Sequence, residues 1–280
     1  MVNIIELQSH IEKIDISFIA VLAVIEIGID LVWHERRNYR DTAANMAIAL
    51  LYSLINTTVG YGIAFAGLKF FSQFSLWQIA TNIWTVILAI AIADFLYYWQ
   101  HRTEHQIRFF WAYHNVHHSS TDYNLTVASR LSWFEACFLW VFYIPMVLLG
   151  FDVLQIFIAI EITAIYQIWI HTQKIGRLGI LDKILNTPAL HRVHHGSNLN
   201  YIDKNFGAIL MIWDRLFRTY QMENEPVTYG LTENINTNNP IKIQAIEYRR
   251  IKQYIYQSRS LKEIFYSIFG NLAWKPKKLR

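Results

Sequence analysis

Histidine is the residue type in this chain most clearly arranged for chemistry. Eight of the 11 histidines fall in three tight clusters, and a ninth, His171, lies between the second and third. The clusters are His101 and His105; His114, His117 and His118; and His191, His194 and His195. Residues i, i+3 and i+4 share one helix face, so each H-x2-H-H triplet can direct two rings to one metal and the third to a neighbouring metal. A structural tetrahedral site uses four ligands, so this number of imidazoles predicts two metals with four or five nitrogens each.

The ligand type narrows the choice of metal. Imidazole suits zinc, copper, iron and nickel, and the single cysteine, Cys137, is remote from the clusters in sequence. Nitrogen-rich ligation suits a redox metal that binds O2, with two irons as the first choice. The non-enzymatic alternative is a membrane metal transporter or metal-binding scaffold. A transporter predicts ionisable residues through the whole membrane depth, whereas these ligands gather toward one side.

The elements that carry the histidines are strongly apolar. Of 280 residues 54% are hydrophobic and only 16% are charged, against about 25% charged in ordinary soluble domains. Five runs approach the length of roughly 20 residues that spans a bilayer. They cover residues 16–33, 44–65, 77–99, 133–149 and 153–170, and the last two are joined as a hairpin by only three residues. The pattern predicts an all-α integral membrane protein.

Lysine and arginine predict the orientation. They alternate between rich and poor loops, with Arg36, Arg37 and Arg40 after the first run but only Lys69 after the second. The positive-inside rule then places all nine clustered histidines on the cytoplasmic side. Anionic lipid headgroups account for the net charge of +4, so no nucleic-acid partner is implied. The segment 241–269 has helical periodicity and is expected either on the membrane face or packed on the cytoplasmic part.

The third run carries a polar stripe. Asp94, Tyr98, His101 and His105 are spaced by four, three and four residues and share one helix face. Ionisable residues inside membrane helices are costly and usually functional. We expect Asp94 to accept a hydrogen bond from the second ring nitrogen of a ligand histidine. Glu161, ten residues before His171, is expected to face the same cavity as that histidine.

The three motifs HRTEH, HNVHH and HRVHH resemble the fatty acid hydroxylase / sterol desaturase superfamily of membrane di-iron enzymes, over about Asp94 to Tyr220. Two longer segments, 117–130 and 171–220, resemble alkylglycerol monooxygenase and its bacterial relatives. The resemblance implies four to five membrane helices with a cytosolic helical cap that holds a histidine-rich di-metal site. Its implied metal ligands are the eight clustered histidines, with His171 added provisionally.

The resemblance also implies a reaction and its cofactors. The reaction is O2-dependent hydroxylation of a lipid alkyl chain, with ether lipid cleavage in the alkylglycerol monooxygenases; the alternative within the superfamily is a lipid or sterol desaturase. The cofactors are two iron ions, O2 and an external reductant, either tetrahydrobiopterin or an electron-transfer protein. The partners are a lipid from the bilayer and that electron donor; the oligomeric state stays open.

The whole chain is expected to form one domain of the fatty acid hydroxylase type. It divides into N-terminal membrane helices (1–99), a histidine-box core (100–220) that includes the membrane hairpin 133–170, and C-terminal cytosolic or interfacial helices (221–280). A multi-pass protein of the bacterial inner membrane is favoured. The closing KKLR resembles a dilysine retrieval signal, which would indicate the endoplasmic reticulum membrane in a eukaryote.

Overall fold

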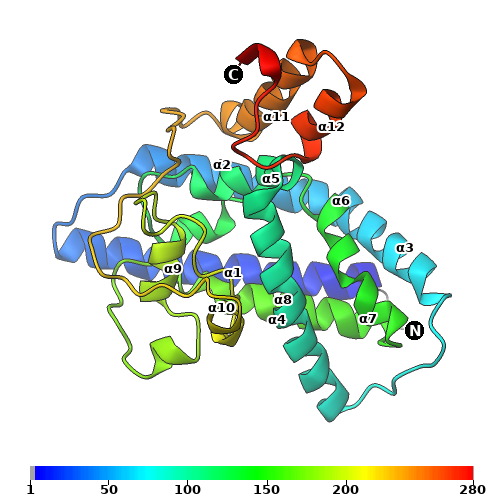
Figure 1. The fold of residues 1–280 in the computed structure, drawn as a ribbon. Coiled ribbons are helices and arrows are strands. Elements are labelled where there is room, and N and C mark those ends of the chain that lie inside the picture. Colours follow the sequence, from blue (N-terminus) through cyan, green and yellow to red (C-terminus); the bar gives the residue numbers. More distant parts are fainter. Residues whose placement is uncertain (1–3, 280) are drawn as a thin grey trace.

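The regular secondary structure in the described part of the chain is helical. A computed structural model describes residues 4–279, with side chains from residue 17; within these residues there is no strand beyond three isolated bridges. Residues 1–3 of the expected 1–99 segment lie outside the described residues. The α-helices, drawn in Figure 1, are α1 (Ile4–Val32), α2 (Tyr39–Ile55), α3 (Tyr61–Ser72), α4 (Ile83–Gln106), α5 (Arg108–His118), α6 (Ala136–Leu139), α7 (Ile144–Leu148), α8 (Val153–Ile168), α9 (Pro188–His194), α10 (Ile212–Leu216), α11 (Pro240–Gln257) and α12 (Leu261–Phe269). Short helical segments of other types are η1 (Asn56–Gly60), η2 (Leu125–Ser129), η3 (Trp140–Tyr143), η4 (Leu181–Lys183) and η5 (Lys277–Leu279).

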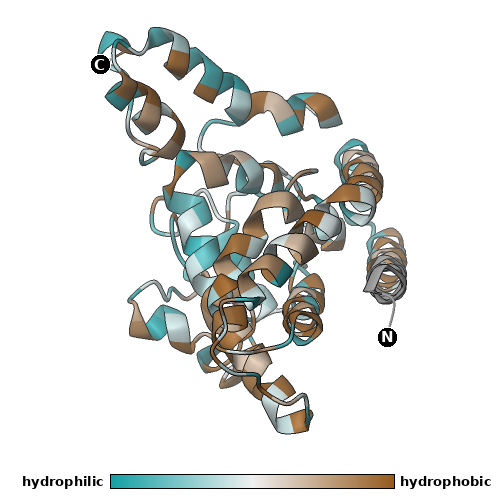
Figure 2. Cartoon of the chain, turned by 90° about the vertical axis from the view of Figure 1, so that its right-hand side faces the viewer, coloured by the Kyte–Doolittle hydropathy of each residue, from teal (hydrophilic) through white to brown (hydrophobic). Residues whose placement is uncertain are grey.

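Among the residues that the structure describes, two helical stretches are long and apolar enough to cross a membrane. They are Tyr39–Ser72, in which η1 joins α2 to α3, and α4; the apolar segments Ala136–Leu148 and Val153–Ile168 are shorter. Large apolar side chains on both long stretches point outward, among them Leu50 at 72% and Trp84 at 76% exposure. Many helical turns in Figure 2 are brown, whereas the lobe that ends at the C-terminus carries more teal. Outward apolar faces of this extent are typical of a membrane protein.

Two of the five expected runs differ in the structure. The run 77–99 becomes helical only at Ile83, because the Asn82 side chain accepts the N–H groups of Trp84 and Thr85 and so fixes the helix start there. The run 133–149 is broken into α6, η3 and α7 rather than forming one helix of spanning length. The chain still reverses direction between α7 and α8. It does so at Gly150, whose φ of +92° suits glycine.

Small residues let the apolar helices approach closely. Ala89 and Ala93 of α4 are fully buried in the main apolar cluster, together with Met146 of α7 and Ile156 of α8. This packing fixes α4 against α8. Histidines lie in the last turns of α4 and just after the end of α8. A side chain on Gly67 of α3 would collide with the Trp140 indole.

The segment 241–269 forms two helices that differ in their packing. Helix α11 packs on the remainder of the chain: Glu247 accepts a hydrogen bond of 2.7 Å from the buried Arg108 of α5. Helix α12 exposes Leu261, Phe265 and Phe269, which share one face at four-residue spacing. These two helices form the upper lobe in Figure 1.

Candidate metal centre

All nine predicted histidines converge on one place. They come from the end of α4, from α5, from the third residue after α8, and from α9 with its C-cap. Their ligating atoms form two groups, within each of which the atoms lie no more than 4.8 Å apart. The first group is His101, His105, His114, His118 and His194, and the second is His117, His171, His191 and His195.

The two triplets are divided as their spacing predicts. His114 and His118, four residues apart on α5, join the first group, while His117 between them joins the second. On α9 the assignment is reversed: His191 and His195 join the second group and His194 the first. The two groups are therefore adjacent, since each triplet contributes to both.

Nε2 atoms make the close approaches within both groups. In the first, Nε2 of His114 lies 2.9 Å from that of His101 and 3.0 Å from that of His118. In the second, Nε2 of His171 lies 2.9 Å from that of His191 and 3.1 Å from that of His117. Nitrogens bound about 2.0–2.1 Å from one metal ion are roughly 2.9–3.4 Å apart, for angles between right-angled and tetrahedral.

The opposite ring nitrogens orient several of these rings. Nδ1 of His101 lies 2.9 Å from the carbonyl of Phe206, that of His171 2.7 Å from the carbonyl of Gln167, and that of His194 2.9 Å from the carbonyl of Lys204. A carbonyl only accepts, so each Nδ1 must carry the proton and each Nε2 a bare lone pair. Several bare lone pairs directed at one point repel unless a cation lies among them, so these residues fit a metal ion in each group.

Burial keeps these rings neutral. The pKa values of His114, His117, His118, His191, His194 and His195 all lie well below the usual value, first because burial disfavours the charged ring and then because neighbouring histidines would repel it. For His171 burial lowers the pKa to about 4. Neutral imidazole is the form that ligates a metal.

Asp94 has a different role from the one expected. It is buried, but its carboxylate accepts the backbone N–H groups of Ile209 and Leu210 and the indole N–H of Trp213, at 2.8, 3.3 and 2.8 Å. The expectation that it bonds to a ligand ring is therefore wrong. Asp94 holds the segment before α10, and that segment supplies the Phe206 carbonyl to His101. Its action on the histidines is indirect.

Sequence reasoning missed two carboxylates that support the site. Glu104 of α4 places Oε2 3.2 Å from Nδ1 of His114, and it is 3% exposed. Asp214 accepts the backbone N–H groups of Phe206 and Gly207 at 2.8 and 2.7 Å, so it fixes the same loop as Asp94. The position of Glu104 inside the HRTEH motif is the feature of the sequence that could have indicated its role.

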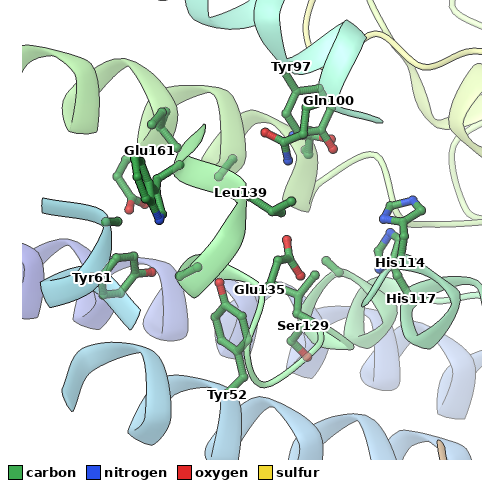
Figure 3. A pocket seen from close by; sticks show the side chains of 18 of the residues that line it. Tyr52, Tyr61, Tyr97, Gln100, His114, His117, Ser129, Glu135, Leu139 and Glu161 are labelled. Carbon is green, nitrogen blue, oxygen red and sulfur yellow. The ribbon is translucent and has the colours of Figure 1, made fainter. Parts of the chain in front are cut away.

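A cavity of about 280 Å³ leads away from the histidines. Its lining includes His114, His117 and His171 at one end, and residues of the apolar helices α2, α3, α6 and α8 along its length. Glu161 and His171 both line it, as the sequence predicted. Figure 3 shows the polar residues inside it, with His114 and His117 on one side and Tyr61 and Glu161 on the other.

Comparisons with known proteins show which proteins this chain is similar to. Residues 86–219, which hold all nine histidines, match the family model described as fatty acid hydroxylase. The resemblance predicted from the histidine motifs is confirmed. The chain is 43% identical to alkylglycerol monooxygenase of Homo sapiens over 198 residues, covering 70% of the chain and 44% of the relative. It is 35% identical to the enzyme of that name from Xenopus tropicalis, covering 99% of the chain and 62% of the relative.

A relative with a different name is also similar to the chain. Ornithine lipid hydroxylase OlsE of Rhizobium tropici is 29% identical, with 75% of the chain and 67% of the relative covered. The chain spans less than two thirds of the length of the alkylglycerol monooxygenases from Homo sapiens and Xenopus tropicalis. No solved structure matches the chain. Together with the two apolar helices, these relatives indicate a membrane protein.

Proposed function

We propose that this protein is a membrane oxygenase that uses O2 to hydroxylate a lipid alkyl chain. The observation that carries the proposal is the contact between the two histidine groups and the cavity: His114 of the first group and His117 and His171 of the second all line it. An alkyl chain in that cavity lies beside both candidate metal positions. The printed names of the relatives, alkylglycerol monooxygenase and ornithine lipid hydroxylase, support the same class of reaction.

The two groups are proposed to hold two iron ions. The His101 group would supply up to five imidazole ligands to the first ion, and the His117 group up to four to the second. When bound, the pair supplies the redox chemistry that activates O2. The chain's own residues hold the rings neutral, orient them through carbonyls and Glu104, and keep the site buried.

The remaining components are inferred from the same assignment. A lipid enters from the bilayer, and an external reductant, tetrahydrobiopterin or an electron-transfer protein, supplies electrons. The chain crosses the membrane several times and holds the histidines toward the cytoplasm, in agreement with the lysine and arginine pattern.

Isotope labelling tests the reaction. Purified protein is loaded with Fe(II) without oxygen, then given an alkylglycerol, a reductant and ¹⁸O2, and the lipids are analysed by mass spectrometry. Hydroxylation predicts ¹⁸O in the lipid-derived product and its loss in His114→Ala. A product that lacks two hydrogens and carries no label indicates the desaturase alternative. Tight metal binding without O2 consumption under any reductant contradicts both and favours a metal-binding scaffold.

A further inference from the structure

Arg192 joins the two segments that carry the closest pair of rings in the second histidine group. It directly follows His191 on α9, and its Nη1 donates to the carbonyl oxygens of Thr172 and Ile175 at 3.0 and 2.7 Å. Thr172 in turn directly follows His171. One buried side chain therefore binds the backbone beside one ring to the backbone beside the other.

The guanidinium of Arg192 is itself held in a fixed orientation. Its Nε and Nη2 donate to the two carboxylate oxygens of Glu223 at 3.0 and 2.6 Å, and this bidentate arrangement fixes the plane of the group. The Arg192 side chain is 8% exposed, so water screens the ion pair only weakly. The link between the two segments is therefore rigid.

A second contact attaches the segment after α8 to helix α1. The Thr172 hydroxyl donates to Oε1 of Glu26 at 2.5 Å, while Oε2 of Glu26 accepts from Arg37 at 2.7 Å and from the backbone N–H of Leu125 at 2.9 Å. Glu26 is 2% exposed, and a buried carboxylate is costly unless it is paired and hydrogen-bonded. These three bonds account for a carboxylate in an otherwise apolar part of α1. That helix supplies none of the nine histidines, yet it holds the segment that carries one of them.

His191 depends on the backbone of α9 for its position. Nδ1 of His171 and Nδ1 of His194 each lie against a backbone carbonyl, whereas Nδ1 of His191 has no hydrogen-bond partner among the described residues. Helix α9 has seven residues and is too short to be stable without tertiary contacts. Arg192 provides such contacts one residue away. A shift of α9 would therefore displace the ring of His191, while His194 keeps its bond to the Lys204 carbonyl.

We propose that Arg192 and Glu26 are positioning residues for the metal of the second histidine group. The inference deepens the proposed function and rests on its assignment of a metal to that group. Arg192 sets the separation between α9 and the segment after α8, and Glu26 anchors that segment to α1. Nitrogens that share one metal lie about 3 Å apart. Nε2 of His171 and Nε2 of His191, at 2.9 Å, meet this condition only while the two segments keep their separation.

Part of this support lies outside the region that matches the family model. Thr172 and Arg192 lie within residues 86–219, whereas Glu26 and Glu223 lie outside them. The second histidine group is therefore supported by α1 and by the segment after α10, in addition to the matched region that supplies its ligands.

The first histidine group is oriented by other residues. Its rings are held by Glu104 and by the carbonyl oxygens of Phe206 and Lys204. None of these contacts includes Arg192 or Glu26. Loss of either positioning residue should therefore weaken one metal more than the other. A merely structural role predicts instead that both metals are weakened together or that neither is.

Metal titration tests the proposal without requiring turnover. Full-length protein in detergent is stripped of metal and titrated with Co(II) under argon, and binding is followed by visible absorption and equilibrium dialysis. His171→Ala and His114→Ala give the reference spectra of the first and the second site alone. Thr172→Val removes the hydroxyl that binds Glu26 at almost constant volume. It should lower the affinity for one Co(II) roughly tenfold, the lower end of the effect of losing an outer partner, and leave the spectrum of His171→Ala.

Conservative and control variants separate positioning from stability. Thr172→Ser keeps the hydroxyl and should bind both Co(II) ions as the wild type does. Arg192→Met removes the other link and should weaken the same ion; where it does not fold, Thr172→Val alone decides. Glu247→Gln is the matched control, since it breaks a buried ion pair of 2.7 Å with Arg108 that lies on α5 and α11. It should lower the Tm and leave the ratio of the two Co(II) affinities unchanged.

Three results overturn the proposal. The first is a wild-type ratio of the two affinities in Thr172→Val, whether both ions bind normally or both are weakened equally. The second is a loss in Thr172→Ser as large as that in Thr172→Val, because the hydroxyl is then not the link. The third is a selective loss in Glu247→Gln, because the ratio then reports general destabilisation.

Failure here is distinguishable from failure of the proposed function. Selective weakening of one Co(II) in Thr172→Val, without ¹⁸O incorporation by the wild type, leaves the positioning role in place and contradicts the oxygenase. Incorporation of ¹⁸O by the wild type, with unchanged Co(II) binding in Thr172→Val, supports the oxygenase and contradicts the positioning role. A wild-type protein that binds only one Co(II) contradicts the assignment of two metals and overturns the positioning role with it.

Discussion

Glu104 and His114 are joined by a contact of 3.2 Å between the carboxylate Oε2 and Nδ1 of the ring. The Nε2 atom of the same ring lies at the middle of the first histidine group, 2.9 Å from His101 and 3.0 Å from His118. A carboxylate behind a ligand histidine fixes the ring orientation and raises its basicity. Glu104 is therefore a positioning residue for His114.

Removal of this carboxylate should weaken metal binding at the first group. We expect Glu104→Ala to lower the affinity for the ion roughly 10- to 100-fold, the usual effect of losing such a partner, and Glu104→Gln to lower it less. Metal content after dialysis against a competing chelator measures the change. Glu233→Ala, at a glutamate whose side chain is 80% exposed, is the matched control. Full metal occupancy in Glu104→Ala at every chelator concentration would contradict the assignment.

Asp94 should influence the histidines only through the loop that it holds. Asp94→Ala removes the acceptor for three N–H groups and leaves them buried without partners, so we expect a loss of stability of about 3 kcal/mol or more. His101 should lose alignment as the Phe206 carbonyl shifts. Thermal unfolding in detergent and metal content measure the two effects. Asp94→Asn keeps one carbonyl acceptor and should recover part of both; a variant with lower metal content but unchanged stability would contradict the indirect role.

Helical spacing predicted the division of the histidines because that division is local. Two turns of α5 and of α9 determine which rings face which group, and neither depends on distant contacts. The partners of Asp94 could not be predicted in this way, since Ile209 and Leu210 are more than 100 residues away in an irregular segment. The sequence indicated correctly that Asp94 is buried and polar, but not what it contacts.

Glu104 shows a different limit of the sequence. Its contact with His114 exists because the chain leaves the helical conformation at Ile107, so that α5 folds back against α4. The spacing of the apolar residues in the sequence does not indicate that the helix ends there. The prediction for the run 133–149 was wrong for a similar reason, because hydropathy alone does not distinguish one long helix from three short helical segments, of which α6 and η3 line the cavity.

Arg130 should be the residue whose loss destabilises the α2–α5 contact most. It is fully buried and donates to the Val116 carbonyl at 3.0 Å, to Ser119, and across to Asp41 and Asn45 of α2 at 3.1 and 2.7 Å. Arg130→Ala leaves the Asp41 carboxylate without its cation, at a cost of about 3–5 kcal/mol. Thermal unfolding should show a lower Tm, and the double variant Arg130→Met with Asp41→Asn should regain part of it. Additive losses in the double variant would show that the pair is not coupled.

Acidification should destabilise the metal-free protein. The folded pKa of His171 is about 4, lowered by burial, whereas a histidine in the unfolded chain titrates near 6.5. Below about pH 6.5 the unfolded chain binds protons that the folded site does not bind. The free energy of unfolding therefore falls with decreasing pH until the folded pKa is reached. The other buried histidines outside α4 shift in the same direction. We expect the Tm of chelator-treated protein to fall by several degrees between pH 7.5 and pH 5, and metal to raise the Tm at pH 7.5. His34→Gln, at a histidine outside both groups, should follow the same curve, whereas His171→Gln should make the fall in Tm smaller, because the other buried histidines still contribute. A Tm of the metal-free protein that is constant across this range would contradict the burial of neutral rings.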